Sequence, residues 1–355
     1  MAVVSYKCPN CDGPLVFRPR ENDFYCDFCQ SRFNKSEVEA GNSGAAETVS
    51  AAPKTQITED AELFEKEAVT YSCPSCGAEI ITAESTAATQ CYYCHNPVIL
   101  SGKLSREFRP DRLIPFSISK DEAIKRFKDF CAKKRMLPKE FLTEGTFESV
   151  TGVYYPYYIV DAKIFGQATA KSKTTRTWIA GNFQYTEISD YHHERKGDLD
   201  VEGIAVSAYK DGDRNLLKYV CPFDESKSVD FAMMYLSGFQ AEKRQLGKAD
   251  LYGEIEKKLR DIAENQFKGS INAGGAITSF EMKINDLKDH WEYFLFPLWV
   301  MTYNYRGKLY RYAINGQTGK LYGELPVDKL KLFTTAAVSA LAVLAAILIY
   351  GGFAA

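Results

Sequence analysis

The 355-residue sequence lacks several features that would assign it to a functional class. The stretch before Cys8 is too short for the apolar region of a signal peptide, so we expect no export signal. The sequence contains only four histidines and none of the motifs typical of helicases, kinases, hydrolases or dinucleotide-binding enzymes. The segment 315–320 resembles a phosphate loop, but its glycine spacing is wrong, and it is predicted to be a hairpin turn. These absences favour a protein that is not an enzyme.

Positive charge is scarce in the N-terminal region. Residues 1–100 carry 7 Lys and Arg against 14 Asp and Glu, and 70–101 has no Lys or Arg. Because phosphate binding depends on neutralisation by cations, this region favours a protein partner over nucleic acid. The segment 103–135 is basic, with 11 Lys and Arg against 5 Asp and Glu. One face of its helix could meet anionic lipid or an acidic partner, or it could simply be solvated.

Cysteine is arranged in a strict pattern. Eight of the ten cysteines form four Cys-x-x-Cys pairs, and the second quartet repeats the first at an offset of 65 residues with the same 14-residue interval. Two such pairs can place four thiolates tetrahedrally around one Zn²⁺ and close its coordination shell. The sequence therefore predicts two structural zinc ions, with iron as the alternative metal. The predicted ligands are Cys8, Cys11, Cys26 and Cys29 in one site and Cys73, Cys76, Cys91 and Cys94 in the other.

The C-terminal segment has no charged residue from 332 to 355. About 20 apolar residues suffice to span a bilayer, so 332–353 is predicted to be a transmembrane helix. Lys320, Lys329 and Lys331 precede it, which places the N-terminal bulk in the cytoplasm. The free thiols that zinc requires agree with a reducing compartment.

The predicted organisation is multidomain. Two small β zinc ribbons are followed by a strand-rich mixed α/β domain, which could be internally duplicated, and by one C-terminal transmembrane helix. The duplication is suggested by 155–160 and 296–301, with Gly166 and Gly307 as matching turns. The predicted bounds are 1–35 for the first ribbon, 36–69 for a flexible acidic linker, 70–101 for the second ribbon, 105–327 for the α/β domain and 332–353 for the membrane helix.

Three helices are predicted within the α/β domain. Ser119 and Glu122 form a capping-box pattern before the apolar positions of the first helix. A second amphipathic helix contains Leu251 and Leu259 and ends before Gly269, and a third covers 229–236.

Three other groups could carry chemistry. His192 and His193 are adjacent, so in a strand they would point to opposite faces and would not share one site. Cys131 lies on the apolar face of a predicted helix, and Cys221 lies in an apolar stretch, so both are expected to be packing residues.

The combination of motifs resembles the bacterial TFIIB-type zinc-ribbon membrane proteins. The likeness lies in the tandem CPxC…CxxC ribbons, the YYPYYIVD strand, the segment Tyr235 to Glu242 and the INGQTGKLYGELP stretch. This resemblance implies residence in the bacterial inner membrane. It also implies partnership with phage-shock-protein-A-like coat proteins and flotillin-type proteins of membrane-stress systems. Only the eight cysteines carry over as functional residues.

Three functions are therefore open. The favoured one is a tail-anchored adaptor that recruits a protein partner through its ribbons and contacts the lipid bilayer through its C-terminal helix. The alternatives are a membrane-bound nucleic-acid-binding protein and an enzyme with a site near His192.

Overall fold

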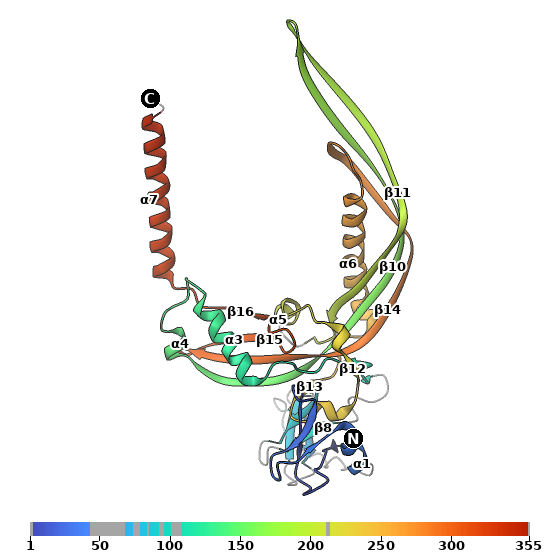
Figure 1. Ribbon diagram of the computed structural model, residues 1–355, viewed down its shortest axis with the longest axis vertical. Helices are drawn as coiled ribbons and strands as arrows, with labels where there is room; N and C mark the ends of the chain where they lie inside the picture. Colours follow the sequence, from blue (N-terminus) through green and yellow to red (C-terminus); the bar gives the residue numbers. More distant parts are fainter. Residues whose placement is uncertain are drawn as a thin grey trace, which may run out of the picture.

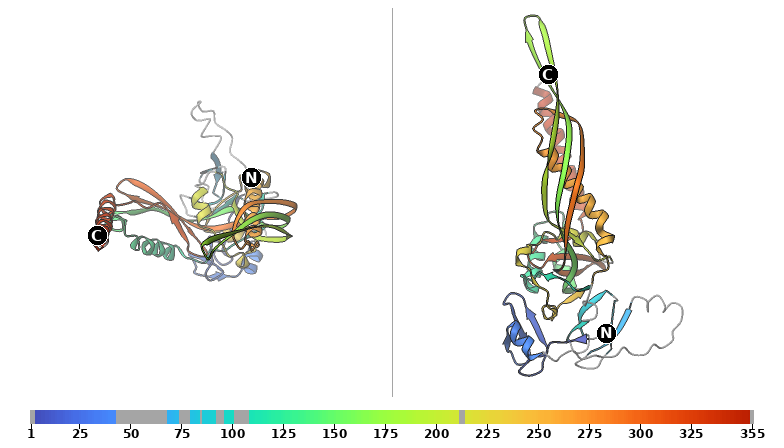
Figure 2. Two further views of the ribbon diagram at one scale, coloured as in Figure 1. Left: turned by 90° about the horizontal axis from the view of Figure 1, so that it is seen from above. Right: turned by 90° about the vertical axis from the view of Figure 1, so that its right-hand side faces the viewer.

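The computed structural model describes residues 3–42, 68–73, 79–83, 85–91, 96–100, 108–210 and 214–353. Figure 1 shows a central body with the N-terminal region packed beneath it. Two arms rise from the opposite side of the body, one a long β-hairpin and the other a C-terminal helix, and Figure 2 shows the same arrangement from two further directions. The N-terminal region and the two arms therefore lie at opposite ends of the molecule.

An eleven-stranded sheet runs through the body. Its main path is β1-β8-β7-β13-β10-β14-β15-β16, with β11 beside β10 and β9 beside β14. The long strands of the sheet are β10 (Thr146–Ala180), β11 (Phe183–Ser207), β14 (Ala276–Tyr305) and β15 (Lys308–Asn315). The shorter strands are β1 (Val3–Val4), β7 (Thr86–Gln90), β8 (Pro97–Leu100), β9 (Arg112–Leu113), β12 (Val229–Asp230), β13 (Gln240–Glu242) and β16 (Leu321–Gly323).

The centre of β10 is buried on both faces. Tyr154 and Tyr158 point into the larger apolar core, whereas Tyr157 and Ile159 point into a second core on the other face. Because alternate residues of a strand face opposite sides, a continuous apolar run is what such a doubly covered strand requires. The YYPYYIVD motif is therefore explained by packing.

Helices cover parts of the sheet. Helix α3 begins at Ser119, whose side chain accepts a hydrogen bond from the Glu122 amide at 3.2 Å, and α6 buries Leu251 and Leu259. Both predicted helices are confirmed, but 229–236 forms only β12 and a short 3-10 helix. The helices are α1 (Lys35–Gly41), α3 (Lys120–Ala132), α4 (Phe141–Glu144), α5 (Arg214–Tyr219), α6 (Lys248–Gly269) and α7 (Lys329–Phe353), with 3-10 helices η3 (Glu225–Lys227) and η4 (Met233–Leu236).

The predicted turn at Gly166 is wrong. Strand β10 continues through Gly166 with only a β-bulge, whereas Gly307 does lie in a turn, with φ +76°. The two similar segments pair directly, with Tyr155 opposite Phe296 in an antiparallel ladder. Their likeness reflects two neighbouring strands that are buried in the same layers.

The predicted transmembrane helix is also wrong. Helix α7 covers the predicted segment, but among the described residues no helix is both long and apolar enough to cross a membrane. The expected single-pass residence in the bacterial inner membrane is corrected accordingly.

The predicted fold class needs a second correction. The described residues form a strand-rich mixed α/β protein with one N-terminal four-cysteine cluster. Strands β7 and β8 of the second cysteine repeat belong to the main sheet, because β13 pairs with both β7 and β10. The other two strands of the second cysteine repeat are β5 (Ala68–Ser72) and β6 (Glu79–Ala83), which pair with each other.

Candidate metal centre and its attachment to the body

The first cysteine quartet is held by a small three-stranded sheet. Its strands are β2 (Leu15–Arg18), β3 (Asp23–Cys26) and β4 (Arg32–Phe33). Both Cys-x-x-Cys turns have the same geometry, because the amides of Asp12 and Gln30 donate to the carbonyls of Cys8 and Cys26 at 2.9 and 2.8 Å. Asp12 and Gln30 both have positive φ, near +57° and +58°, which turns the chain back sharply. The two turns thus present their thiols to one point.

The four thiols have the spacing that a tetrahedral metal site needs. Their sulfurs all lie within 4.8 Å of one another, and the Cys8–Cys29 and Cys11–Cys26 pairs are each 3.5 Å apart. Four sulfurs at about 2.3 Å from a central Zn²⁺ would be about 3.8 Å apart. The cluster could therefore hold one metal ion such as zinc, with all four positions taken by protein.

The surroundings of the cluster also fit bound thiolates. The Asn10 amide donates to the Cys8 sulfur at 3.4 Å, and the Ser31 hydroxyl lies 3.3 Å from the Cys29 sulfur. At Gly13 an added Cβ would lie 3.2 and 3.3 Å from the sulfurs of Cys26 and Cys11, so glycine keeps this side of the cluster open. Such a closed site supplies folding free energy rather than a reactive position.

The second quartet is described only in part. Cys73 and Cys91 are buried beside Tyr71, Val98 and Leu100, whereas Cys76 and Cys94 lie outside the described residues. A second zinc site therefore stays a prediction. The expected linker is likewise outside the description, apart from α1 and strand residues 68 and 69.

One segment of the body holds the first cysteine module in place. The Phe17 amide donates to the Ser237 carbonyl at 3.0 Å, and the Ser237 hydroxyl donates to the Leu15 carbonyl. The rings of Phe17 and Tyr235 pack edge to face at 4.9 Å. Gly238 has φ +92°, and an added Cβ there would lie 2.5 Å from a methyl group of Val16. The module is therefore docked firmly on the body.

The same segment joins the second cysteine repeat to the body. Ala241 in β13 lies opposite Ala88 of β7 on one side and Tyr154 of β10 on the other. Strand β1 closes this edge of the sheet by pairing with β8, and next to it the Asn96 side chain donates to the Ser5 hydroxyl at 2.9 Å. The motif from Tyr235 to Glu242 thus connects both repeats to the large sheet. Sequence reasoning singled it out but did not find this role, because strand pairing between distant segments leaves no local signal.

The three histidines among the described residues do not form one site. His192 and His193 are neighbours in β11 and face opposite sides. The His193 ring nitrogen lies 2.8 Å from the Ser172 hydroxyl, and that of His192 lies 3.4 Å from a Glu194 oxygen. His290 is on another strand beside Glu292. The predicted separation of the adjacent histidines is confirmed.

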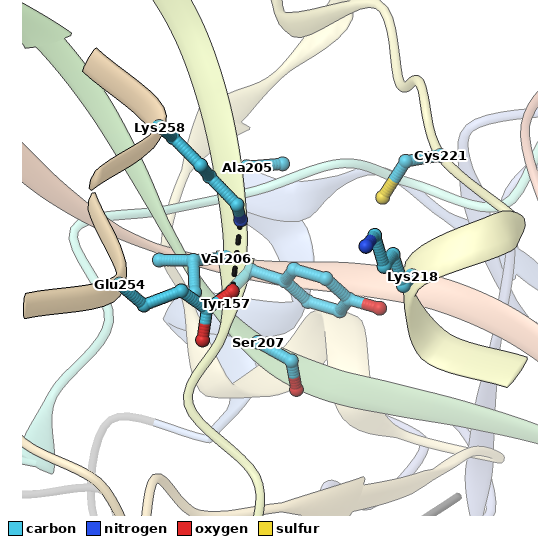
Figure 3. A pocket seen from close by; sticks show the side chains of 8 residues that line it. All are labelled: Tyr157, Ala205, Val206, Ser207, Lys218, Cys221, Glu254 and Lys258. Atoms are coloured by element: carbon cyan, nitrogen blue, oxygen red, sulfur yellow. Dashed lines mark ion pairs between the residues drawn. The ribbon is translucent and has the colours of Figure 1, made fainter. Parts of the chain in front are cut away.

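The two single cysteines are poor nucleophiles. Burial raises the pKa of Cys131 to about 12 and that of Cys221 to about 11, so both thiols stay protonated at neutral pH. Cys221 lines a hollow of about 320 Å³, shown in Figure 3, in which Glu254 and Lys258 form an ion pair at 2.9 Å. The Cys221 thiol donates to the Leu217 carbonyl, which is not a base.

The 315–320 segment is a structural turn, as predicted. It joins β15 to β16, and the fully buried Asn315 side chain donates to the carbonyls of Val220 and Pro222 at 2.9 and 3.0 Å. Gln317 exchanges hydrogen bonds with the backbone of Asp224. The turn therefore fastens the 220–224 loop to the sheet and leaves no phosphate cradle.

The fold and the cluster together define a class: a strand-rich α/β protein with a docked four-cysteine metal module. The chain is similar to the uncharacterized protein YdjG of Bacillus subtilis (strain 168), with 28% identity over 330 residues that cover 93% of this chain and 92% of the relative. It is thus a distant homologue of YdjG. No protein family profile matches the chain, and no solved structure matches it either.

Proposed function

We propose that this chain is an adaptor that binds a protein partner through its first zinc module. The observation that carries the proposal is Phe28, whose side chain is 75% exposed although it lies between two metal ligands. Large aromatic side chains that protrude from a rigid support are typical anchors of protein interfaces. The module that carries Phe28 is rigid for two reasons. Its four cysteines would bind one metal ion, and the module is docked on the body.

Charge around Phe28 indicates the kind of partner. Asp12 and Asp27 are exposed beside it, and four thiolates around one Zn²⁺ add a net charge of about −2. A complementary surface would offer an apolar pocket ringed by Lys or Arg. The same charge opposes a nucleic-acid partner, whose phosphates would be repelled.

The resemblance supplies a specific candidate. We infer that the partner is a phage-shock-protein-A-like coat protein, with flotillin-type proteins as further members of the assembly. The proposal assigns the chain no catalytic step, in keeping with the closed coordination of the cluster and the protonated single cysteines. The chain would then bind its partner through one module that is docked on the body, rather than through a ribbon on a flexible linker.

Co-purification tests the proposal. The full chain and a Phe28→Ser variant are compared for retention of a co-expressed phage-shock-protein-A-like protein, with Tyr252→Ser as control because Tyr252 is an aromatic residue 44% exposed on α6. Retention by the wild type and the control, but loss in Phe28→Ser with zinc still bound, is the expected result. Equal retention by all three would remove the proposal, as would salt-sensitive capture of DNA or RNA instead of protein.

A further inference from the structure

The long β-hairpin ends in a segment that no other element covers. Strand β14 stops pairing with β10 where Ala276 lies opposite Lys173, so 174–189 is a two-stranded ribbon. It turns at Gly181, which has φ +63°. Figure 1 shows this tip as the part of the molecule farthest from the N-terminal region. A two-stranded ribbon is only marginally stable in water by itself, so we consider which surroundings its side chains suit.

The tip carries large apolar side chains. Trp178 lies opposite Tyr185 with the rings stacked at 5.6 Å, and Phe183 lies on the same face two pairs further out. Ile179 occupies the other face, by strand alternation, and Ile188 lies on that face behind the Arg176–Glu187 pair. The exposed fractions are 42% for Trp178, 76% for Ile179, 70% for Phe183, 46% for Tyr185 and 57% for Ile188.

The tip is also free of charge. No residue in 177–186 is ionisable apart from the Tyr185 phenol, and the first ionic pair of positions is Arg176 opposite Glu187. The Arg176 guanidinium lies 5.8 Å from the centre of the Trp178 ring. The Arg176–Glu187 pair, which we call the collar, is therefore the first charged position behind the apolar end.

Apolar groups on both faces and at the end point to a medium that surrounds the tip. A flat protein patch would cover one face and leave the other in water, whereas lipid headgroups and upper acyl chains can close around it. Trp and Tyr side chains concentrate at this interface because they combine an apolar body with a polar group. A lipid surface is thus the best fit for this pattern.

The backbone sets a limit on depth. Each strand of the two-stranded tip has one outer edge with unpaired N–H and C=O groups, which hydrocarbon cannot satisfy. We propose that residues 178–185 form a lipid-docking tip that enters only the headgroup region of a bilayer, up to the Arg176–Glu187 collar. Because the tip is uncharged, docking depends little on anionic lipid or on salt. This inference is independent of the protein-binding proposal, which concerns the opposite end of the molecule.

Tryptophan fluorescence tests the tip directly. Trp291 and Trp299 are only 9% and 8% exposed, so Trp178 is the tryptophan that vesicles can reach. With the full chain and phosphatidylcholine vesicles that carry a nitroxide quencher on their headgroups, we expect quenching that persists at high salt. The Trp178→Phe variant should lose the quenching, which would assign it to the tip.

A further pair of variants measures the energetic contribution of the tip. Trp178 is kept as reporter while Ile179→Ser and Phe183→Ser are combined, and vesicle-dependent quenching should weaken at least about tenfold. Tyr252→Ser on α6 should leave it unchanged. The proposal is overturned by a folded wild type whose Trp178 emission does not respond to the headgroup-labelled lipid. It is equally overturned if these substitutions abolish self-association or capture of a purified protein while quenching stays at the wild-type level.

Discussion

At the scale of single residues, the metal centre depends on space beside the thiols as much as on the thiols. Gly13→Ala would bring a methyl group within 3.3 Å of two sulfurs and 3.0 Å of the Phe28 ring. We expect this variant to lower zinc affinity by at least about tenfold, because the ligands must shift to admit the methyl group. Gly197→Ala is the control, since nothing lies within 4 Å of its added Cβ. Competition with a chromogenic chelator measures both, and equal affinities would contradict the described geometry.

A second prediction at this scale concerns pH. Burial, and then repulsion from Asp161, Glu292, Asp224 and Glu202, raises the pKa of the Glu225 carboxyl above its usual 4.5. The native state therefore binds this proton more tightly than the unfolded state does. The ionised Glu225 carboxylate destabilises the native state at pH 7, and this destabilisation decreases as the pH falls from 7 toward 4.5. Glu225→Gln should raise the free energy of unfolding at pH 7 by up to about 0.5 kcal/mol, discounted for solvent screening, with a smaller gain at pH 5. Urea titrations at both pH values check it, and a gain that grows toward pH 5 would refute it.

At the scale of elements, one short segment controls whether the first cysteine module stays on the body. Gly238→Ala would place a Cβ 2.5 Å from Val16 at a backbone angle that alanine adopts poorly. We expect it to weaken docking by about 1–3 kcal/mol, seen as faster hydrogen exchange of the Phe17 amide, which bonds to Ser237. Gly253→Ala, with nothing within 4 Å, should leave that exchange unchanged and stabilise α6 slightly. Unaltered protection in Gly238→Ala would show that the contact does not hold the module.

The elements also show which features the sequence could predict. The cap at Ser119, the apolar stripe of α6 and the turn at 315–320 are local patterns, and each was predicted correctly. The continuation of β10 past Gly166 could have been found from the alternating buried residues Ala162, Ile164, Ala168 and Ala170. A glycine between two apolar runs instead suggested a turn.

At the scale of the whole molecule, the parts that sequence reasoning missed depend on contacts between distant segments. The first four-cysteine cluster followed from spacing alone, because its cysteines lie in two short turns. The attachment of both cysteine repeats through 235–242 depends on backbone contacts across more than a hundred residues, which no local pattern encodes. The apolar C-terminal composition correctly indicated a helix, α7, but among the described residues no helix is both long and apolar enough to cross a membrane.

The proposed function places a partner at one end of the molecule and the lipid-docking tip at the other. Its central claim is that Phe28 anchors the partner. The most direct measurement is calorimetric titration of the zinc-loaded full chain with a purified phage-shock-protein-A-like protein, comparing wild type, Phe28→Ser and Tyr252→Ser. We predict binding at least about 30-fold weaker for Phe28→Ser, equivalent to about 2 kcal/mol, with Tyr252→Ser unchanged. Equal affinity of all three, or no binding by the wild type, would contradict the claim.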